Sequence, residues 1–224
     1  MEPIILNDIP FRPDVGLLKE RLRVRDGRYA DDLVRLVAAA QAVARPRAVF
    51  KVAFVEERGD DWVVVDGVRL TSRVLRVNLD QAQRVLPFVA TCGVELDEWS
   101  RTIDDVLQRY WADAILETAL SAALRALDER LVEQAGPTSS MAPGSLEDWP
   151  LAEQRPLFAI LGDVEGAVGV RLTEGLMMTP VKSLSGLHFA TEEGFASCQL
   201  CQREGCPGRR APYDAGLYER KYRA

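Results

Sequence analysis

Apolar residues recur at helical spacing in two long stretches of the chain. In residues 31–44 and again in residues 97–134, successive apolar positions lie three or four residues apart, which places them on one face of a helix. Asp31 or Asp32 is expected to cap the first helix, and Pro46 ends it because the residue before a proline avoids the helical region. The second stretch contains no proline and is predicted to form one bent helix or two helices in succession.

Shorter segments have mixed helical and extended character. Residues 48–55 and 62–65 are rich in β-branched and aromatic side chains and flank a turn at residues 59–61, so they are predicted to pair as antiparallel strands. The other predicted elements are helices at 13–24 and 153–161, strands at 86–90 and 168–172, a loop at 138–150, and a turn with a strand at 183–189. Helices and strands without regular β-α alternation indicate the α+β class.

Composition and charge exclude several functional classes. The chain has 224 residues, of which 47% are hydrophobic and 28% charged, so a globular core is easily supplied. A net charge of −6 argues against a nucleic-acid partner, because such proteins cluster Lys and Arg. No apolar run approaches the roughly 20 residues that span a bilayer, and residues 1–13 lack the basic region of a secretory signal. We therefore expect a cytoplasmic protein with no membrane association.

Three cysteines near the C-terminal end form a C-x2-C-x4-C motif at Cys198, Cys201 and Cys206. Thiols stay reduced in the cytoplasm, so closely spaced cysteines there suggest metal ligands or redox groups rather than disulfides. Two thiolates separated by two residues can converge on one metal, and the third can close around it. An iron–sulfur cluster, a structural zinc ion and unligated thiols all stay open, and Cys92, His188, a partner or an exogenous ligand could complete the coordination.

The segment from Arg171 to Phe189 carries a second signal. It reads RLTEGLMMTPVKSLSGLHF and resembles the activation domain of cobalamin-dependent methionine synthase. In that family, leucine-threonine-glutamate is followed by methionine, proline and a serine-x-serine-glycine turn before an aromatic residue. Nine positions match in order and spacing: Leu172, Thr173, Glu174, Met178, Pro180, Ser183, Ser185, Gly186 and Phe189.

The resemblance also implies candidate site residues. The family loop that contacts S-adenosylmethionine holds an arginine and then proline-glycine-tyrosine, and the corresponding residues here are Ser140, Pro143, Gly144 and Ser145. Serine cannot replace the bidentate fork with which an arginine grips a carboxylate, so weak or absent S-adenosylmethionine binding is expected. The residues implied as cofactor-binding or corrin-facing are Pro143, Gly144, Glu174, Ser185 and Gly186.

The resemblance implies helices around an antiparallel sheet and a role beside a corrinoid protein. The single histidine, His188, lies outside the aspartate-x-histidine-x-x-glycine motif that ligates cobalt, so cobalamin is expected on a partner, either a corrinoid-binding protein or the methionine synthase core. We expect an activation-like domain at residues 1–196 with a cysteine-containing tail at 197–224. Its expected function is reactivation of a cobalamin-dependent methyltransferase, with an electron possible through a cysteine-bound cluster. The alternative is a non-catalytic, zinc-stapled docking protein.

Overall fold

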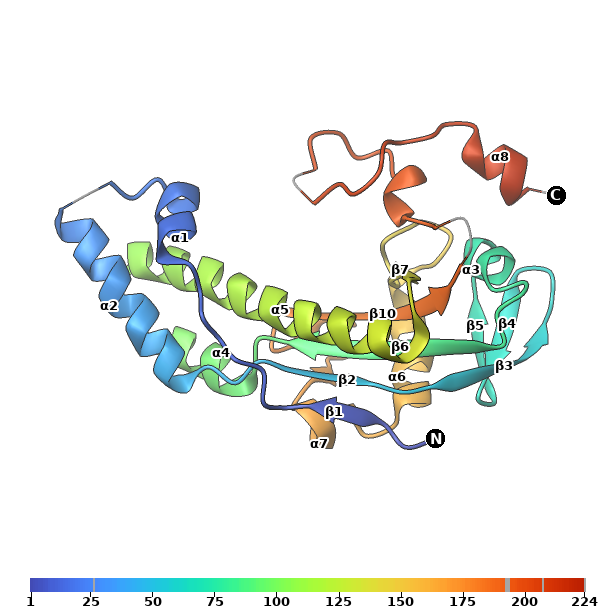
Figure 1. Cartoon of the computed structure of the whole chain (residues 1–224), viewed down its shortest axis with the longest axis horizontal. Coiled ribbons are helices and arrows are strands. Elements are labelled where there is room, and N and C mark those ends of the chain that lie inside the picture. The colour runs from blue at the N-terminus through green and yellow to red at the C-terminus, as the bar shows by residue number, and fades with distance from the viewer. Residues whose placement is uncertain (26, 192–193, 207, 224) are drawn as a thin grey trace.

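A single antiparallel sheet forms the centre of the molecule (Figure 1). The structure is a computed structural model, and it describes residues 1–25, 27–191, 194–206 and 208–223. The strands of the sheet are β1 (Ile4–Leu6), β2 (Arg47–Phe50), β3 (Ala53–Arg58), β4 (Trp62–Val65), β5 (Val68–Thr71), β6 (Arg84–Thr91), β7 (Thr138–Met141) and β10 (Ser183–Ala190). A separate hairpin pairs β8 (Arg171–Leu172) with β9 (Met178–Thr179).

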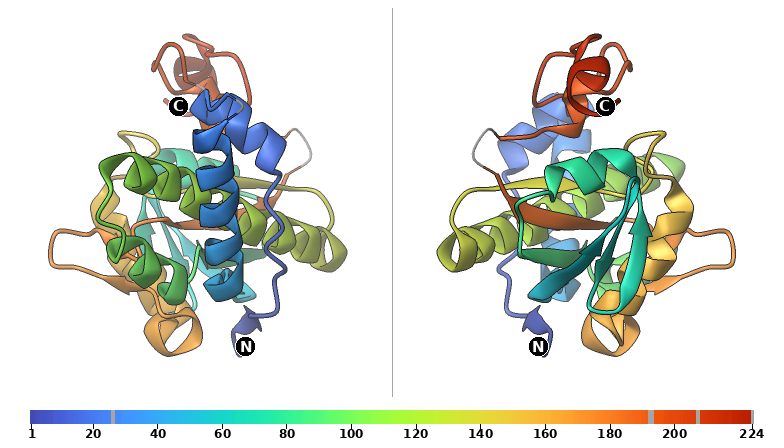
Figure 2. Two further views of the ribbon diagram at one scale, coloured as in Figure 1. Left: turned by 90° about the vertical axis from the view of Figure 1, so that its left-hand side faces the viewer. Right: turned by 90° about the vertical axis from the view of Figure 1, so that its right-hand side faces the viewer.

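Helices lie on both sides of this sheet, which confirms the predicted α+β class (Figure 2). They are α1 (Val15–Leu22), α2 (Arg28–Val43), α3 (Arg73–Asn78), α4 (Val94–Arg101), α5 (Val106–Ala135), α6 (Gln154–Leu161), α7 (Val164–Val168) and α8 (Leu217–Lys221), with 3-10 turns η1 (Leu151–Glu153) and η2 (Ser197–Gln199). Among the described residues, no helix has the length and apolar character needed to cross a membrane.

Strand β6 is the inner strand on which the sheet is built. It pairs with β2 and β3 along one side and with β10 along the other, while β7 pairs with the outer side of β10. Leu86 and Phe88 face α5, whereas Val85 and Val89 belong to the cores on the opposite face. Because both faces are covered, the strand is a continuous apolar run rather than an alternating one.

The predicted strand at 48–55 is present but interrupted. Strands β2 and β3 keep one register against β6, with Phe50 opposite Phe88 and Ala53 opposite Val85. Between them, the backbone N–H of Lys51 donates to the carbonyl of Pro87 at 3.1 Å. Pro87 has no N–H to return a bond, so the ladder is broken at this point.

The two long helical patterns are confirmed with one correction to their boundaries. Residues 97–134 form two helices in succession, α4 and α5, and the Asp105 side chain caps α5 by accepting from the backbone N–H of Gln108 at 2.8 Å. The expected cap of α2 at Asp31 or Asp32 is wrong, because the helix begins earlier, at Arg28, after Gly27. Asp32 instead pairs with arginines on its own helix.

Three other sequence expectations are corrected by the sheet. The segment 138–150 is not all loop, because Thr138–Met141 forms β7 against β10. The serines and glycine expected in a turn at 183–188 lie inside β10, a strand of eight residues. The strand expected at 168–172 is limited to Arg171–Leu172, because Val168 ends α7.

The C-terminal tail is attached to the body by aromatic residues. This segment contains few aliphatic residues, so something other than aliphatic packing must hold it. Tyr222 is 1% exposed, and its hydroxyl donates to Asn78 Oδ1 at 3.1 Å. At the other end, the backbone N–H of Phe195 donates to Ser139 Oγ at 2.6 Å, and Ala196 forms an isolated parallel bridge with Ser140. The tail therefore lies along the free edge of β7 and over α3 (Figure 1).

Candidate functional site

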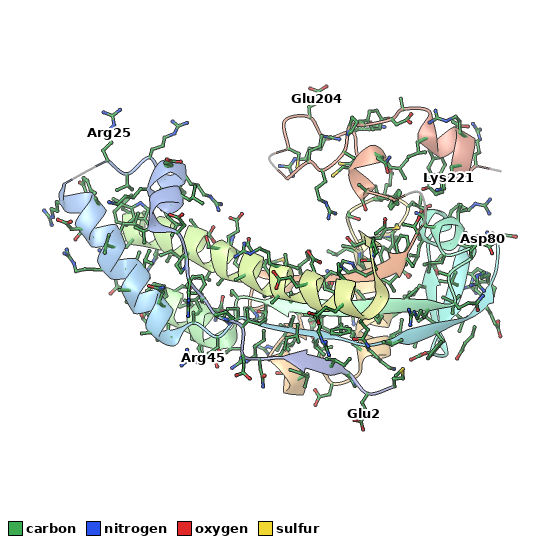
Figure 3. The ribbon with its side chains drawn as sticks, in the orientation of Figure 1. Glu2, Arg25, Arg45, Asp80, Glu204 and Lys221 are labelled. Carbon is green, nitrogen blue, oxygen red and sulfur yellow. The ribbon has the colours of Figure 1, made fainter. Side chains whose placement is uncertain are left out.

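The predicted metal ligands lie in one loop of the tail. We call residues 198–211 the cysteine loop; Pro207 lies outside the described residues. Cys198, Cys201 and Cys206 are all free thiols and all partly exposed. Glu204, between the second and third cysteine, lies at the outer tip of the loop (Figure 3). The loop therefore presents its thiols near the surface, where a metal or a redox partner can reach them.

The sulfur of Cys198 is in an environment that favours the thiolate. It accepts a hydrogen bond from the backbone N–H of Arg210 at 3.4 Å. This bond is the largest cause lowering the pKa of the Cys198 thiol, and the nearby charges of Arg209 and Arg210 act in the same direction. A thiolate is the form that attacks disulfides and binds metals.

Cys92 does not belong to this site. It is fully buried at the end of β6 in the core that contains Leu96 and Trp111, and burial raises the pKa of its thiol to about 12. The tail lies beside the opposite end of β6, and the seven residue steps from Arg84 to Thr91 separate the two ends of this strand by roughly 23 Å. Cys92 is thus excluded as the further ligand considered from the sequence.

His188 is also engaged in packing rather than free to bind a metal. Its Nδ1 atom lies 2.8 Å from Thr138 Oγ1, and its ring lies 5.0 Å from that of Phe88. Burial lowers the pKa of the imidazole to about 4, with a smaller contribution from the charge of Arg210. Among the described residues, no three His, Cys, Asp or Glu side chains are grouped so that they could hold a metal ion. The metal site at the three cysteines stays a prediction.

The candidate residues from the family-like segment are not all brought together. Glu174 lies at the exposed tip of the β8–β9 hairpin, where the Arg155 side chain donates to its backbone carbonyl at 3.1 Å. Within the part of the chain that the structure describes, the Glu174 carboxylate forms no hydrogen bond or ion pair. Ser185 and Gly186 instead lie in the sheet interior, 2% exposed in the case of Ser185.

Gly186 and the Pro143-Gly144 loop are neighbours through β7. A Cβ atom on Gly186 would lie 2.7 Å from the carbonyl oxygen of Met141, the last residue of β7, so glycine is required for this close approach. The loop continues directly into Pro143 and Gly144, and Gly144 has a φ of +81° and donates to the Trp149 carbonyl at 2.7 Å. These three candidate residues therefore share one region, and Glu174 does not.

Ser185 has hydrogen-bonding capacity that the protein does not use. Its Oγ is buried on the face of β10 that points toward α6 and forms no hydrogen bond with any described residue. A buried hydroxyl without a partner is costly, so a ligand atom or an ordered water is expected beside it.

The residues at the arginine and tyrosine positions do not provide an anion site. Ser140 is paired with Ala196 of the tail, and the Ser145 hydroxyl donates to the Ala142 carbonyl at 2.6 Å. Neither side chain carries a positive charge, and neither can form a bidentate fork. The described residues at these two positions therefore do not fit the carboxylate of S-adenosylmethionine.

A cavity separates the loop after β7 from the cysteine loop. Its volume is about 430 Å³, and it is lined by Leu146 and Glu147 on the body and by Leu200, Gln202 and Tyr213 on the tail. The two regions singled out from the sequence thus face each other across one cavity.

Comparison with known proteins identifies the fold. No protein-family model matches the chain, and no curated protein sequence matches it. Among solved structures, the chain is similar to one described as "Crystal Structure of the MetH Reactivation Domain bound to AdoHcy", with 18% sequence identity and a TM-score of 0.56. The match covers 84% of this chain and 78% of that one. The predicted activation-domain-like fold is therefore confirmed.

Proposed function

We propose that this protein is a reactivation or accessory protein for a cobalamin-dependent methyltransferase of the methionine synthase type. The observation that carries the proposal is the fold shared with the MetH reactivation domain over 84% of the chain. The nine matched residues between Leu172 and Phe189 also support it, because they lie in the β8–β9 hairpin, in β10 and in the segment that joins them.

The proposed step restores cobalamin that has been oxidised. Cob(II)alamin on the partner takes one electron from a low-potential reductant, such as a reduced flavoprotein or an iron–sulfur protein, and becomes cob(I)alamin. The electron pair on the cobalt of cob(I)alamin then attacks the methyl group of a methyl donor. The bond between that methyl group and the donor breaks, and the demethylated donor is released. This protein holds the corrin partner while the electron and the methyl group arrive.

Cobalamin is proposed to remain on the partner throughout. The only histidine of the chain, His188, is 9% exposed and held by Thr138, so it is not available to ligate cobalt. Of the corrin-facing residues that the resemblance implies, Ser185 and Gly186 are buried within β10. The exposed residues of the loop after β7 are Gly144, Ser145 and Glu147, and Glu174 on the hairpin is exposed as well.

The cysteine loop is proposed to bind one metal centre. An iron–sulfur cluster held there would supply a low-potential electron, and a zinc ion would only stabilise the loop. Cys198, Cys201 and Cys206 would be the ligands, and the N–H of Arg210 would donate to the sulfur of Cys198.

S-adenosylmethionine is proposed to bind weakly or not at all. AdoHcy, the ligand of the similar structure, belongs to that protein. In this chain, Ser140 and Ser145 support weak or absent binding, since neither side chain provides a cation for the methionyl carboxylate.

Reactivation kinetics test the proposal. The protein is mixed anaerobically with a cob(II)alamin-loaded methyltransferase and a low-potential reductant, and the recovery of cob(I)- or methylcobalamin is followed by absorption. Recovery should be faster with the protein than without it, and Glu174→Gln should reduce the effect. The matched control is Glu165→Gln, which changes an exposed glutamate away from the hairpin, on α7. Equal recovery with and without the protein would show that it is not a reactivation factor.

The second candidate is a non-catalytic docking protein with a zinc-stapled tail. Two observations favour this candidate. Tyr222 already attaches the tail to the body, and the partly exposed thiols of the tail are accessible to a zinc ion. Anaerobically purified protein should be brown if the centre is an iron–sulfur cluster and colourless if it is zinc. Metal analysis of the same sample distinguishes the two candidates.

A further inference from the structure

Cys198 and Cys201 lie on the same side of one short helical turn. The 3-10 turn η2 (Ser197–Gln199) is extended by a further hydrogen bond, in which the backbone N–H of Cys201 donates to the carbonyl of Cys198 at 3.3 Å. A 3-10 turn has three residues per turn and rises about 2 Å per residue, so side chains three positions apart are eclipsed. The Cα atoms of the two cysteines are therefore about 6 Å apart along one face of the turn.

The burial of the turn follows the same period of three. Ser197 is 8% exposed, and Leu200 packs against the core that contains Trp149. These two residues form the face that rests on the body. Cys198 and Cys201 form another face, and both are partly exposed. The two thiols are therefore eclipsed and open to solvent together.

This arrangement suits a reversible disulfide between the two cysteines. A disulfide needs Cα atoms about 4.4–6.8 Å apart, and a separation of about 6 Å lies within that range. The Arg209 guanidinium donates to the carbonyl oxygens of Cys198 at 3.0 Å and Cys201 at 3.1 Å, so one group holds the backbone of both. Cys206, five residues later, lies outside this turn.

The two sulfurs have different surroundings, which gives them different roles. Cys198 Sγ accepts the backbone N–H of Arg210 at 3.4 Å, whereas Cys201 Sγ accepts no hydrogen bond within the described residues. A sulfur that accepts an N–H beside positive charge is the better nucleophile in its thiolate form. The cysteine loop contains three arginines and one glutamate, and the Arg210 side chain is exposed. This charge attracts an anionic substrate to Cys198.

We propose that Cys198 and Cys201 form a thiol–disulfide exchange site whose substrate is a small anionic disulfide. The Cys198 thiolate attacks one substrate sulfur, the substrate S–S bond breaks, and one thiolate leaves while the other half stays on Cys198 as a mixed disulfide. Cys201 then gives its proton to water and attacks the Cys198 sulfur, which releases the second thiolate and forms the Cys198–Cys201 disulfide. The protein loses two electrons, and the substrate is reduced to two thiols.

This activity goes beyond the proposed function and does not depend on it. A metal at the cysteine loop would occupy the same sulfurs, so the exchange belongs to the metal-free protein. The reaction needs only the two eclipsed thiols of one turn, whereas metal binding needs a third ligand to converge with them.

Oxidised glutathione, an anionic disulfide, tests the proposal on the full chain, reduced and freed of metal by a chelator under anaerobic conditions. The unchanged protein should release both halves of the glutathione disulfide and gain a disulfide that peptide mapping assigns to Cys198 and Cys201. Cys201→Ser should release one half and keep the other on Cys198. Cys198→Ser should react roughly tenfold more slowly or worse. The matched control, Cys206→Ser, should behave like the unchanged protein.

Arg210→Ala tests the charge separately, because it keeps the backbone N–H that donates to Cys198 Sγ. This variant should react severalfold more slowly with oxidised glutathione and at a nearly unchanged rate with the neutral bis(2-hydroxyethyl) disulfide. An equal effect on both probes would overturn the preference for an anionic substrate.

The remaining outcomes bear on the cysteine pair. A stable glutathione adduct on the unchanged protein, or a disulfide that includes Cys206, would overturn the pairing of Cys198 with Cys201. No reaction of the unchanged protein would overturn the exchange site as a whole. Matching circular dichroism spectra show that a difference between variants comes from the thiols and not from unfolding. This test contains no cobalamin, so its failure is distinct from a failure of the proposed reactivation function.

Discussion

His188 gives a direct electrostatic test of the structure because it is the only histidine in the chain. It is buried between β6 and α5, with Phe88 against its ring, Thr138 at Nδ1 and the Asp128 carboxylate 3.6 Å from Nε2. Burial, aided by the charge of Arg210, lowers the pKa of the imidazole from 6.5 to about 4. The unfolded chain therefore binds a proton more readily than the folded one as the pH falls below 6.5.

The magnitude follows from the shift in this pKa. At one and a third kcal/mol for each pH unit, a change from 6.5 to about 4 corresponds to a loss of about 3 kcal/mol of folding free energy. The loss begins as the pH falls through 6.5 and is complete near pH 4, with about 2 kcal/mol lost by pH 5. The Asp128 carboxylate favours the protonated ring, so the figure of 3 kcal/mol is an upper value.

Urea denaturation at pH 7, 6 and 5 measures this loss. In this window few other side chains titrate, since the ordinary pKa values of carboxylates lie below it. His188→Gln should remove most of the pH dependence, and Asp128→Asn should steepen it by removing the opposing charge. If the unchanged protein and His188→Gln lose the same free energy between pH 7 and pH 5, burial of a neutral imidazole is the wrong description of this residue.

Three further predictions concern the tail and the cofactor site. Tyr222→Ala should lower the free energy of unfolding by about 3–5 kcal/mol and expose the tail to proteolysis. Tyr222→Phe should lower it by only about 0.5–1.5 kcal/mol, for the lost hydrogen bond. Denaturation curves that coincide for the two variants would contradict the role of Tyr222 as the anchor of the tail. Replacing Cys198, Cys201 and Cys206 together with serine should abolish bound iron or zinc, and full retention of metal by the triple variant would exclude these ligands. Calorimetry should find S-adenosylmethionine binding roughly 10- to 100-fold weaker than in a relative with arginine at the position of Ser140, and micromolar binding would show that another cation takes its place.

The helices and the inner strand could be predicted from the sequence, whereas the edge of the sheet could not. Helices at residues 31–44 and 97–134 depend on local periodicity, which the sequence states directly. Strand β7 depends on β10, about fifty residues later, and its serines and threonine resemble a loop until that partner is known. Gly186 was expected in a turn for the same reason, since only the close approach of Met141 explains a glycine inside a strand.

The residues of the candidate site could be chosen from the sequence, but their arrangement could not be predicted from it. The spacing of the three cysteines identified the loop. Nothing in that spacing indicated that the Arg209 guanidinium donates to the backbone carbonyls of Cys198 and Cys201. The attachment of the tail was also missed, although its aromatic residues were a usable signal: in a segment poor in aliphatic residues, Tyr222 is the side chain most able to bury a large area. Glu174, which the resemblance implies to be cofactor-binding or corrin-facing, lies exposed at a hairpin tip, and its role stays a prediction.

The tail is attached to the body at both of its ends, on either side of the cysteine loop. The bridge between Ser140 and Ala196 holds one end, and the buried ring of Tyr222 holds the other. The entropy of bringing the cysteine loop to the body is therefore lost when the chain folds. Small zinc domains depend on their ion to fold, whereas this tail is fixed to the body by contacts within the protein. A metal bound at the three cysteines would therefore add to an attachment that the protein itself provides, and a partner would meet a tail that the body already holds in place.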